Sequence, residues 1–156
     1  MKSVQNALNR RKKGEKGFTL VELLVVVIII GILAAVAVPI YLNQRKSAWK
    51  SSVQSDVKNA SLALETISTN NNGKISIAGK QDCTHPSCVV TVDAKTGALT
   101  FHASGDGEKI TVSNGNTLTF EAGSNANTYK ITGKNENLGT ENIVYESSTG
   151  SMTTNK

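Results

Sequence analysis

Residues 18–42 read FTLVELLVVVIIIGILAAVAVPIYL, and this stretch decides the fold of the 156-residue chain. Only Thr19 and Glu22 interrupt its apolar character, and the 20 residues from Leu23 to Leu42 carry no charge. A helix of that length spans about 30 Å, which is the thickness of the hydrocarbon core of a bilayer. We therefore expect residues 18–42 to form a transmembrane helix.

The 17 residues before this stretch are strongly basic. They contain six Lys or Arg residues and one Glu, which gives +5 and equals the formal net charge of the whole chain. From Phe18 onward, eleven basic residues face eleven acidic ones. The basic flank predicts that residues 1–17 stay in the cytoplasm and that the C-terminal part lies outside. The neutral remainder predicts no contact with nucleic acid.

Glu22 is the one charge inside the apolar stretch. A carboxylate in hydrocarbon costs roughly 2.5–3.5 kcal/mol by insertion scales, so it marks a functional site whose partner has to be found. In a plain membrane helix, Glu22 would instead reach back to the cytoplasmic interface. A secretory signal peptide is another reading, and residues 35–37 match its A-x-A cleavage pattern. Against that reading, the apolar run is longer than the 7–15 residues of a signal peptide.

The run from Gly17 to Glu22, GFTLVE, resembles the N-terminus of type IV prepilins and of type II secretion pseudopilins. The resemblance covers residues 14–45 closely, and the sequence after Pro39 is most similar to pilin-like proteins of Gram-positive bacteria such as actinobacteria. It implies that a membrane prepilin peptidase cuts between Gly17 and Phe18, removes residues 1–17 and methylates the new amine on Phe18. A glycine at Gly17 allows a protease close access to the backbone.

The amine created on Phe18 would be a cation four residues from Glu22, on the same helix face. Glu22 could pair with it in its own chain or, as the resemblance implies, in a neighbouring subunit of a filament. The second pairing would also explain assembly, because only the filament would supply the missing cation. Before cleavage that cation does not exist, so processing would control assembly.

Gly31 and Pro39 lie inside the apolar helix. Proline removes a backbone donor and clashes with the preceding turn, so we expect local melting or a kink near residues 36–39. The resemblance implies the same loss of helicity once such helices pack in a filament. A simple kink tolerated in lipid is an equal alternative.

Beyond the apolar stretch, residues 43–69 predict an amphipathic continuation of the helix. Apolar residues recur at intervals of three and four, the pattern of one buried helix face. We expect this stripe to dock a head domain, and it consists of Trp49, Val53, Val57, Ala60, Leu64 and Ile67. The charged residues Lys50, Asp56, Lys58 and Glu65 are expected on other faces. The run NNNG at 70–73 supplies residues that end helices and form turns.

Residues 70–156 change to a period of two and are rich in turn residues, which predicts a β-rich head. The expected strands are 74–78, 88–92, 98–102, 109–113, 117–121, 128–132 and 142–146. They carry few apolar residues, so one face of the sheet needs the helix as cover. The predicted fold is therefore α+β and pilin-like: a long N-terminal helix packed against a small antiparallel β-sheet.

Cys83 and Cys88 are expected outside the cell, where a disulfide is stable. A metal site formed with His85 and His102 matches no common zinc spacing. The acidic turn 106–108 could bind calcium but lacks the spacing of an EF-hand. Many pilins carry a disulfide nearer the C-terminus, so the head departs from that pattern. No catalytic constellation is visible, and we predict no enzyme activity, no cofactor and no metal.

These observations predict a structural subunit of a type IV pilus-like filament. It would sit in the cell membrane with an extracytoplasmic head, contact lipid before assembly, and then join copies of itself in a surface filament. The resemblance implies a prepilin peptidase, a membrane platform protein and a cytoplasmic assembly ATPase as partners. The alternatives are a pseudopilin of a secretion or DNA-uptake machine, a minor tip subunit that binds a ligand, and an unassembled membrane-anchored or secreted enzyme.

Overall fold

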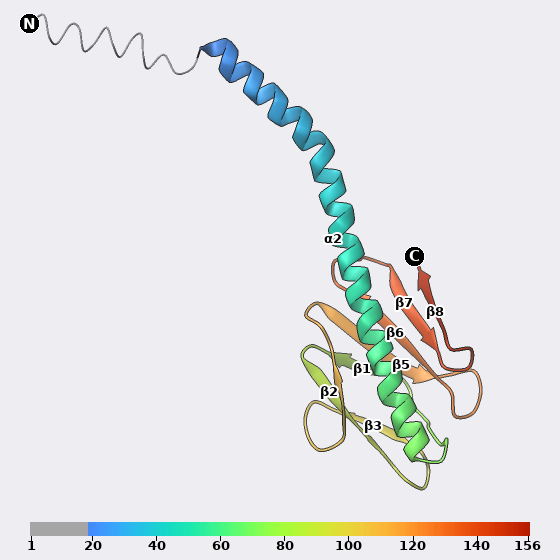
Figure 1. Ribbon diagram of the computed structural model, residues 1–156. Coiled ribbons are helices and arrows are strands. Elements are labelled where there is room, and N and C mark those ends of the chain that lie inside the picture. Colours follow the sequence, from blue (N-terminus) through green and yellow to red (C-terminus); the bar gives the residue numbers. More distant parts are fainter. Residues whose placement is uncertain (1–18) are drawn as a thin grey trace, which may run out of the picture. The chain divides into compact units, whose positions relative to one another are not determined.

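The computed structural model describes residues 19–156, so the basic leader and the predicted Gly17–Phe18 junction lie outside the described residues. The chain divides into two compact units, which meet between Gln44 and Arg45. The helix α2, Leu20–Asn70, contributes to both units (Figure 1). All strands belong to the second unit, which we call the head and which comprises residues 45–156. The predicted α+β fold is confirmed.

The C-terminal end of α2 is set by its last residues. Gly73 donates its N–H to the carbonyl of Ser68 at 2.7 Å. Asn72 and Gly73 have φ values of 55° and 78°, a left-handed conformation that asparagine and glycine tolerate best. The amide of Asn71 also donates to the carbonyl of Lys74 at 3.0 Å. The NNNG run thus ends the helix as the sequence predicts.

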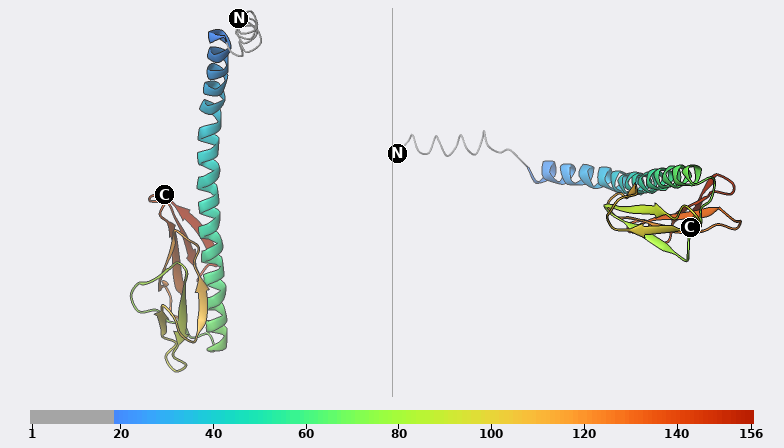
Figure 2. Two further views of the ribbon diagram at one scale, coloured as in Figure 1. Left: turned by 90° about the vertical axis from the view of Figure 1, so that its left-hand side faces the viewer. Right: turned by 90° about the horizontal axis from the view of Figure 1, so that it is seen from below.

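The head contains two antiparallel sheets where the sequence predicts one. The first sheet has five strands in the order β1-β5-β6-β7-β8, and the second has three in the order β3-β2-β4. The strands are β1 (Gln81–Thr84), β2 (Ser87–Val92), β3 (Leu99–His102), β4 (Glu108–Thr111), β5 (Asn116–Ala122), β6 (Tyr129–Asn135), β7 (Asn142–Glu146) and β8 (Ser151–Asn155). The head part of α2 lies along the sheets (Figure 2), and one apolar core joins helix and strands.

Gly133 on β6 allows α2 to lie close to the sheet. A Cβ atom at this buried position would come within 2.5 Å of Val57 Cγ2 and 2.6 Å of Val53 Cγ1. Real Cβ atoms do not approach carbon atoms so closely, so any side chain at 133 would force the helix and the sheet apart. The glycine at 133 is therefore required by the packing of the core and not by the backbone conformation of a turn.

The predicted strand at 74–78 is wrong. Ser76 forms a single parallel bridge with Ala98. The N–H of Ser76 donates to the carbonyl of Gly97, and the carbonyl of Ser76 accepts from the N–H of Leu99. Ile75 and Ile77 are nonetheless buried. The alternation in the sequence therefore identified an extended, half-buried segment correctly, but its backbone pairing stops at this one bridge and forms no ladder.

Two observed strands were missed by the sequence prediction. In β1 only one of four residues, Cys83, is buried. In β8 all five residues are exposed. Neither strand has an alternating apolar face, so the signal that identifies strands from sequence is absent. Backbone pairing with β5 and β7, respectively, holds these strands in the sheet.

Candidate functional site

The helix α2 begins with a reciprocal pair of hydrogen bonds between Thr19 and Glu22. The N–H of Thr19 donates to Glu22 Oε2 at 3.1 Å, and the N–H of Glu22 donates to Thr19 Oγ1 at 3.2 Å. This arrangement is a capping box, which satisfies two backbone donors that a helix N-terminus otherwise leaves unpaired. Glu22 thus has a local role that the sequence analysis did not consider.

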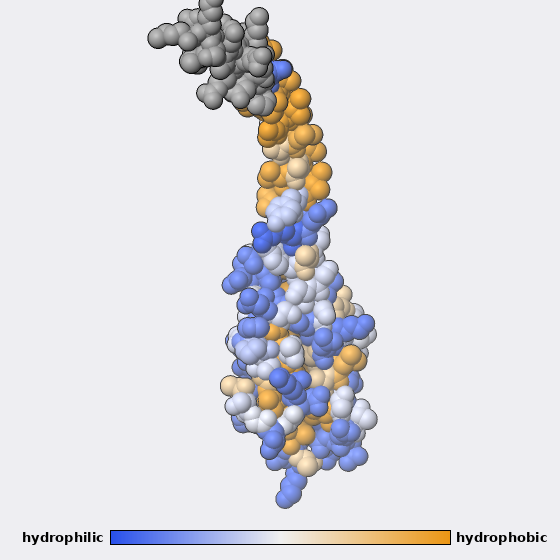
Figure 3. Space-filling view, turned by 60° about the vertical axis from the view of Figure 1, so that its left-hand side comes forward, coloured by the Kyte–Doolittle hydropathy of each residue, from blue (hydrophilic) through white to orange (hydrophobic). Residues whose placement is uncertain are grey.

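Apart from Glu22, the helix surface from Leu20 to Leu42 consists almost entirely of exposed apolar side chains. The large apolar residues in this range are between 47% and 86% exposed. Figure 3 shows them as a continuous hydrophobic surface on the N-terminal part of the helix. Within the described residues, α2 is long and apolar enough to cross a membrane. Such a surface is stable only against lipid or other protein.

Gly31 and Pro39 lie within this surface, and α2 is helical across both positions. A Cβ atom at Gly31 would meet no atom within 4 Å, so packing within the chain does not require a glycine there. The melting expected at these residues concerns helices packed in a filament. A single chain does not test it, and the helix break stays a prediction.

The predicted docking stripe lies on the face of α2 that meets the head. Its members Val53, Val57, Ala60 and Leu64 have no exposed surface, and Ile67 is 7% exposed. Trp49 is partly buried and packs against the same core. The stripe thus packs its part of α2 against the strands of the head by apolar contact. The part of α2 before the stripe keeps its apolar side chains exposed.

The comparisons with known proteins concern the N-terminal region. The model of the prokaryotic N-terminal methylation motif matches residues 12–38. The type IV major fimbrial protein FimA of Dichelobacter nodosus is 49% identical over 55 residues, 35% of each chain. The type II secretion system core protein G of Pectobacterium carotovorum subsp. carotovorum is 32% identical over 68 residues, 44% of each chain.

The N-terminal region of this chain is similar to that of type IV pilins and of type II secretion pseudopilins. A fimbrial protein of Pseudomonas aeruginosa is also 39% identical over 70 residues, 45% of this chain and 46% of that protein. The match therefore covers less than half the length of these relatives. No solved structure matches the chain significantly. The pilin resemblance is thus a property of the N-terminal region, and the head is described from its own structure.

One residue of α2 lies on the buried face of the helix and not on the outer face predicted for it. Asp56 was expected on the outside but is 5% exposed. Its carboxylate accepts hydrogen bonds from the N–H of Ser113 at 2.7 Å, the hydroxyl of Ser113 at 2.9 Å and the amide of Asn116 at 2.7 Å. Asp56 is three residues after Val53 and four before Ala60, so its spacing could have indicated the buried face.

The network around Asp56 extends across the sheet. The amide of Asn135 on β6 donates to Asn116 Oδ1 at 2.6 Å, and both asparagines are buried. A buried carboxylate without hydrogen bonds would be strongly destabilising, but here three donors satisfy it. The network therefore fixes where along α2 the sheet docks, because a shift of the helix would break the three hydrogen bonds to Asp56.

Glu65, also expected on an outer face, accepts a hydrogen bond from the hydroxyl of Tyr129 on β6 at 2.9 Å. Burial and the neighbouring Glu65 carboxylate raise the pKa of Tyr129 above its ordinary value. The phenol therefore stays a neutral hydrogen-bond donor at neutral pH. Lys50, expected outside as well, forms an ion pair with Glu141 at 3.0 Å.

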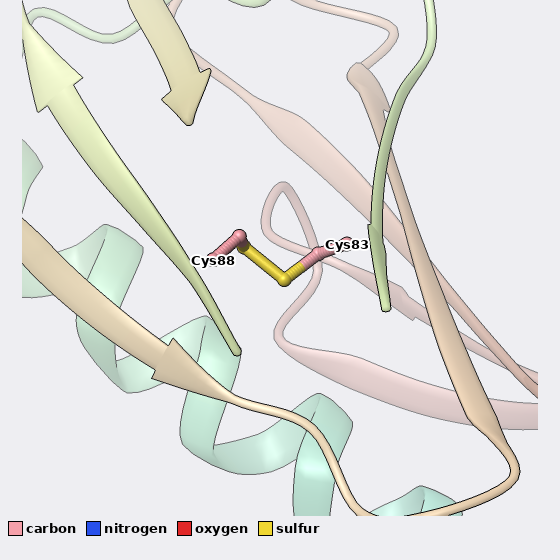
Figure 4. The surroundings of a disulfide bond; sticks show 2 residues. All are labelled: Cys83 and Cys88. Atoms are coloured by element: carbon pink, nitrogen blue, oxygen red, sulfur yellow. A yellow bond between two sulfur atoms is a disulfide. The ribbon is translucent and has the colours of Figure 1, made fainter. Parts of the chain in front are cut away.

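The predicted disulfide between Cys83 and Cys88 is confirmed (Figure 4). Its two Cα atoms are 5.6 Å apart, and both cysteines are almost fully buried. Cys83 lies on β1 and Cys88 on β2, so the bond links the five-stranded sheet to the three-stranded one. Because the sulfur atoms are bonded to each other, they cannot act as the thiolate ligands of the metal site considered from the sequence.

Proposed function

We propose that this chain is the structural subunit of a type IV pilus-like filament. One observation carries the proposal: the capping box and the exposed apolar surface of α2, which together occupy residues 19–42, overlap the methylation motif at residues 12–38. The head buries its own core, whereas this segment has apolar surface on all sides. Such a segment suits a subunit that first lies in lipid and then packs among copies of itself.

Assembly would follow from processing at the N-terminus. A prepilin peptidase would cut between Gly17 and Phe18 and methylate the amine of Phe18, which stays cationic. Glu22 would then pair with the Phe18 amine of a neighbouring subunit. The capping box supports this role, because it holds the Glu22 carboxylate at the first turn of the helix, beside the new terminus. The amide N–H of Thr19 survives cleavage, so the cap can persist in the mature chain.

The subunit would be anchored in the cell membrane by residues 18–42, with the head outside and residues 1–17 inside before cleavage. A platform protein and a cytoplasmic ATPase would drive extraction into a surface filament. No catalytic role is proposed for the chain. The similarity to core protein G specifically favours a second candidate, a pseudopilin of a type II secretion-like machine.

Two measurements test the proposal. N-terminal mass analysis of the mature protein is expected to find methylated Phe18. A terminus at Val38, which cleavage after the A-x-A pattern at 35–37 would create, contradicts it. Electron microscopy of fibres sheared from the cell surface then separates the two candidates. Abundant filaments made mainly of this chain support the pilus subunit, whereas their absence from cells with correctly processed protein supports the pseudopilin.

A further inference from the structure

The first residues of the head form a basic cluster that the filament role leaves unexplained. We call it the collar, and it consists of Arg45, Lys46, Trp49 and Lys50. The guanidinium carbon of Arg45 lies 5.1 Å from the centre of the Trp49 ring, within the range of a cation–π contact. Lys46 and Lys50 both approach the Glu141 carboxylate, at 3.6 and 3.0 Å.

Glu141 neutralises only part of this charge. Two ammonium groups, those of Lys46 and Lys50, face the single carboxylate of Glu141, so one of their two positive charges is left over. Lys50 is the closer partner, and its hydrogen bond is the main reason why the pKa of Glu141 is below its usual range. The Lys46 side chain is 53% exposed. Its ammonium lies 3.6 Å from the Glu141 carboxylate, which is too far for a hydrogen bond. The Lys46 ammonium can therefore bind a further anion.

The position of the collar along the chain limits where that anion can be. Leu42 is the last residue of the exposed apolar surface, and Lys46 follows it by four residues. Four residues span about 6 Å as helix and at most about 14 Å when extended. The headgroup region of a bilayer is roughly 5–7 Å thick on each side. When residues 20–42 span the membrane, Arg45 and Lys46 are therefore at the level of the headgroups.

The side chains of the collar are of the kinds that suit the headgroup region of a bilayer. A guanidinium and an ammonium both bind phosphate oxygens well. Trp49 is an aromatic residue with a polar N–H, the kind of side chain enriched at membrane interfaces. We propose that the collar binds the phosphate headgroups of anionic lipids in the outer leaflet and so holds the unassembled subunit in the membrane. This inference rests on the membrane-inserted state of the proposed function.

The test uses the full-length chain in lipid vesicles, with Trp49, the one tryptophan of the chain, as reporter. Quenching of its fluorescence is measured with brominated phosphatidylglycerol and with brominated phosphatidylcholine at the same bromine content. Enrichment of the anionic lipid around the collar predicts stronger quenching by phosphatidylglycerol. Each basic residue near an anionic surface contributes roughly a fivefold preference, so the double variant Arg45→Gln/Lys46→Gln is expected to lose nearly all of the excess.

The matched control is Lys58→Gln/Lys95→Gln, which removes two charges from exposed lysines outside the collar and is expected to keep the excess. Unfolding of the head in urea checks that both double variants are folded. Equal quenching by the two lipids in the wild type overturns the proposal, as does an excess that the collar variant retains. Loss of the excess in inorganic phosphate, but not in chloride of equal ionic strength, supports binding of the lipid phosphate group.

The measurement needs neither cleavage nor filaments, so it is separate from the test of the proposed function. If the full-length chain does not float with vesicles in a density gradient, the membrane-inserted state itself fails, and with it both proposals. If the chain floats but shows no preference for anionic lipid, only the collar proposal fails.

Discussion

The two units of the chain differ in whether their apolar side chains are buried within the chain. In residues 45–156, helix and strands bury one another, and Leu62 and Met152 are the large apolar side chains that stay exposed in that range. In residues 20–42 the large apolar side chains are all exposed. The head therefore specifies its own fold, whereas the N-terminal segment needs lipid or copies of the chain to become stable. Substitutions in the N-terminal segment should accordingly alter filament yield, whereas substitutions in the head should alter its stability.

The largest effect is expected at Glu22. Glu22→Gln keeps an acceptor for the Thr19 N–H but removes the charge, so it separates capping from ion pairing. If the carboxylate must find a cation in the filament, filament yield falls at least about tenfold while cleavage continues. Yield is measured from sheared fibres, and processing by N-terminal mass analysis.

Two comparisons complete this experiment. Thr19→Val removes one hydrogen bond of the capping box but keeps the charge, so a smaller loss, about fivefold, is expected. The urea midpoint of the head should not change in either variant. Wild-type filament yield from Glu22→Gln would show that capping is the only role of Glu22.

The next largest effect concerns the polar contact between α2 and the sheet. Asp56→Ala leaves three donors, one buried on Asn116 and two partly buried on Ser113, without the carboxylate that accepts from them. We expect the free energy of unfolding to fall by about 3 kcal/mol, roughly 1 kcal/mol per donor. Urea denaturation followed by circular dichroism measures the change. Asp56→Asn keeps an acceptor and should lose less, and a loss below about 1 kcal/mol for Asp56→Ala would show that water replaces the carboxylate.

Gly133→Ala tests the close approach of helix and sheet. The added methyl group would overlap Val53 and Val57, so the free energy of unfolding is expected to fall by about 2 kcal/mol. Gly31→Ala is the matched change in the other unit, where a Cβ meets nothing, and it should leave head stability unchanged. Equal urea midpoints for the two variants would mean that the core adapts to the methyl group.

The smallest effect is expected from acid. Glu121 bridges Lys130 and Lys80 at 2.7 and 2.8 Å, and the hydrogen bond from Lys130, followed by that from Lys80, lowers the pKa of Glu121 below its ordinary 4.5. A lowered carboxyl pKa stabilises the fold above about pH 4.5, and this stabilisation is lost as the pH falls through the lower folded-state value. Ion pairs at a protein surface are typically worth about 0.5 kcal/mol, so only a small change is expected.

Glu121→Gln should therefore lower the melting temperature slightly at pH 7 but not at pH 2. Thermal unfolding at the two pH values measures the difference. A variant that differs from wild type equally at both pH values would show that Glu121 acts through packing and not through its charge.

The contrast between the units also explains what could be predicted from the sequence. The apolar segment was identified because lipid requires a long uncharged run, and β7 was predicted with its observed bounds because its central residues, Ile143, Val144 and Tyr145, are the β-branched and aromatic types that favour strands. The burial of Asp56 was missed because a charged residue was assumed to face water. Its three donors come from Ser113 and Asn116, almost sixty residues later, and their position depends on tertiary contacts.

The division of the strands into two sheets could not be predicted from the sequence either. It depends on β1 pairing with β5, more than thirty residues later, instead of with β2 beside it. The disulfide was expected, but its role in linking two sheets could be seen only once Cys83 and Cys88 were placed on strands of different sheets. Local patterns predict elements well, whereas the choice of partners among similar strands depends on the whole fold.

The strand β8 has a consequence for variation among related chains. All five of its side chains point into solvent, and it is held by backbone pairing with β7. Side chains at 151–155 can therefore change in size and charge without disturbing the core, provided that they keep the extended backbone. If the chain forms a surface filament, every subunit would carry this strand, and a new five-residue surface could evolve on the fibre at almost no loss of stability.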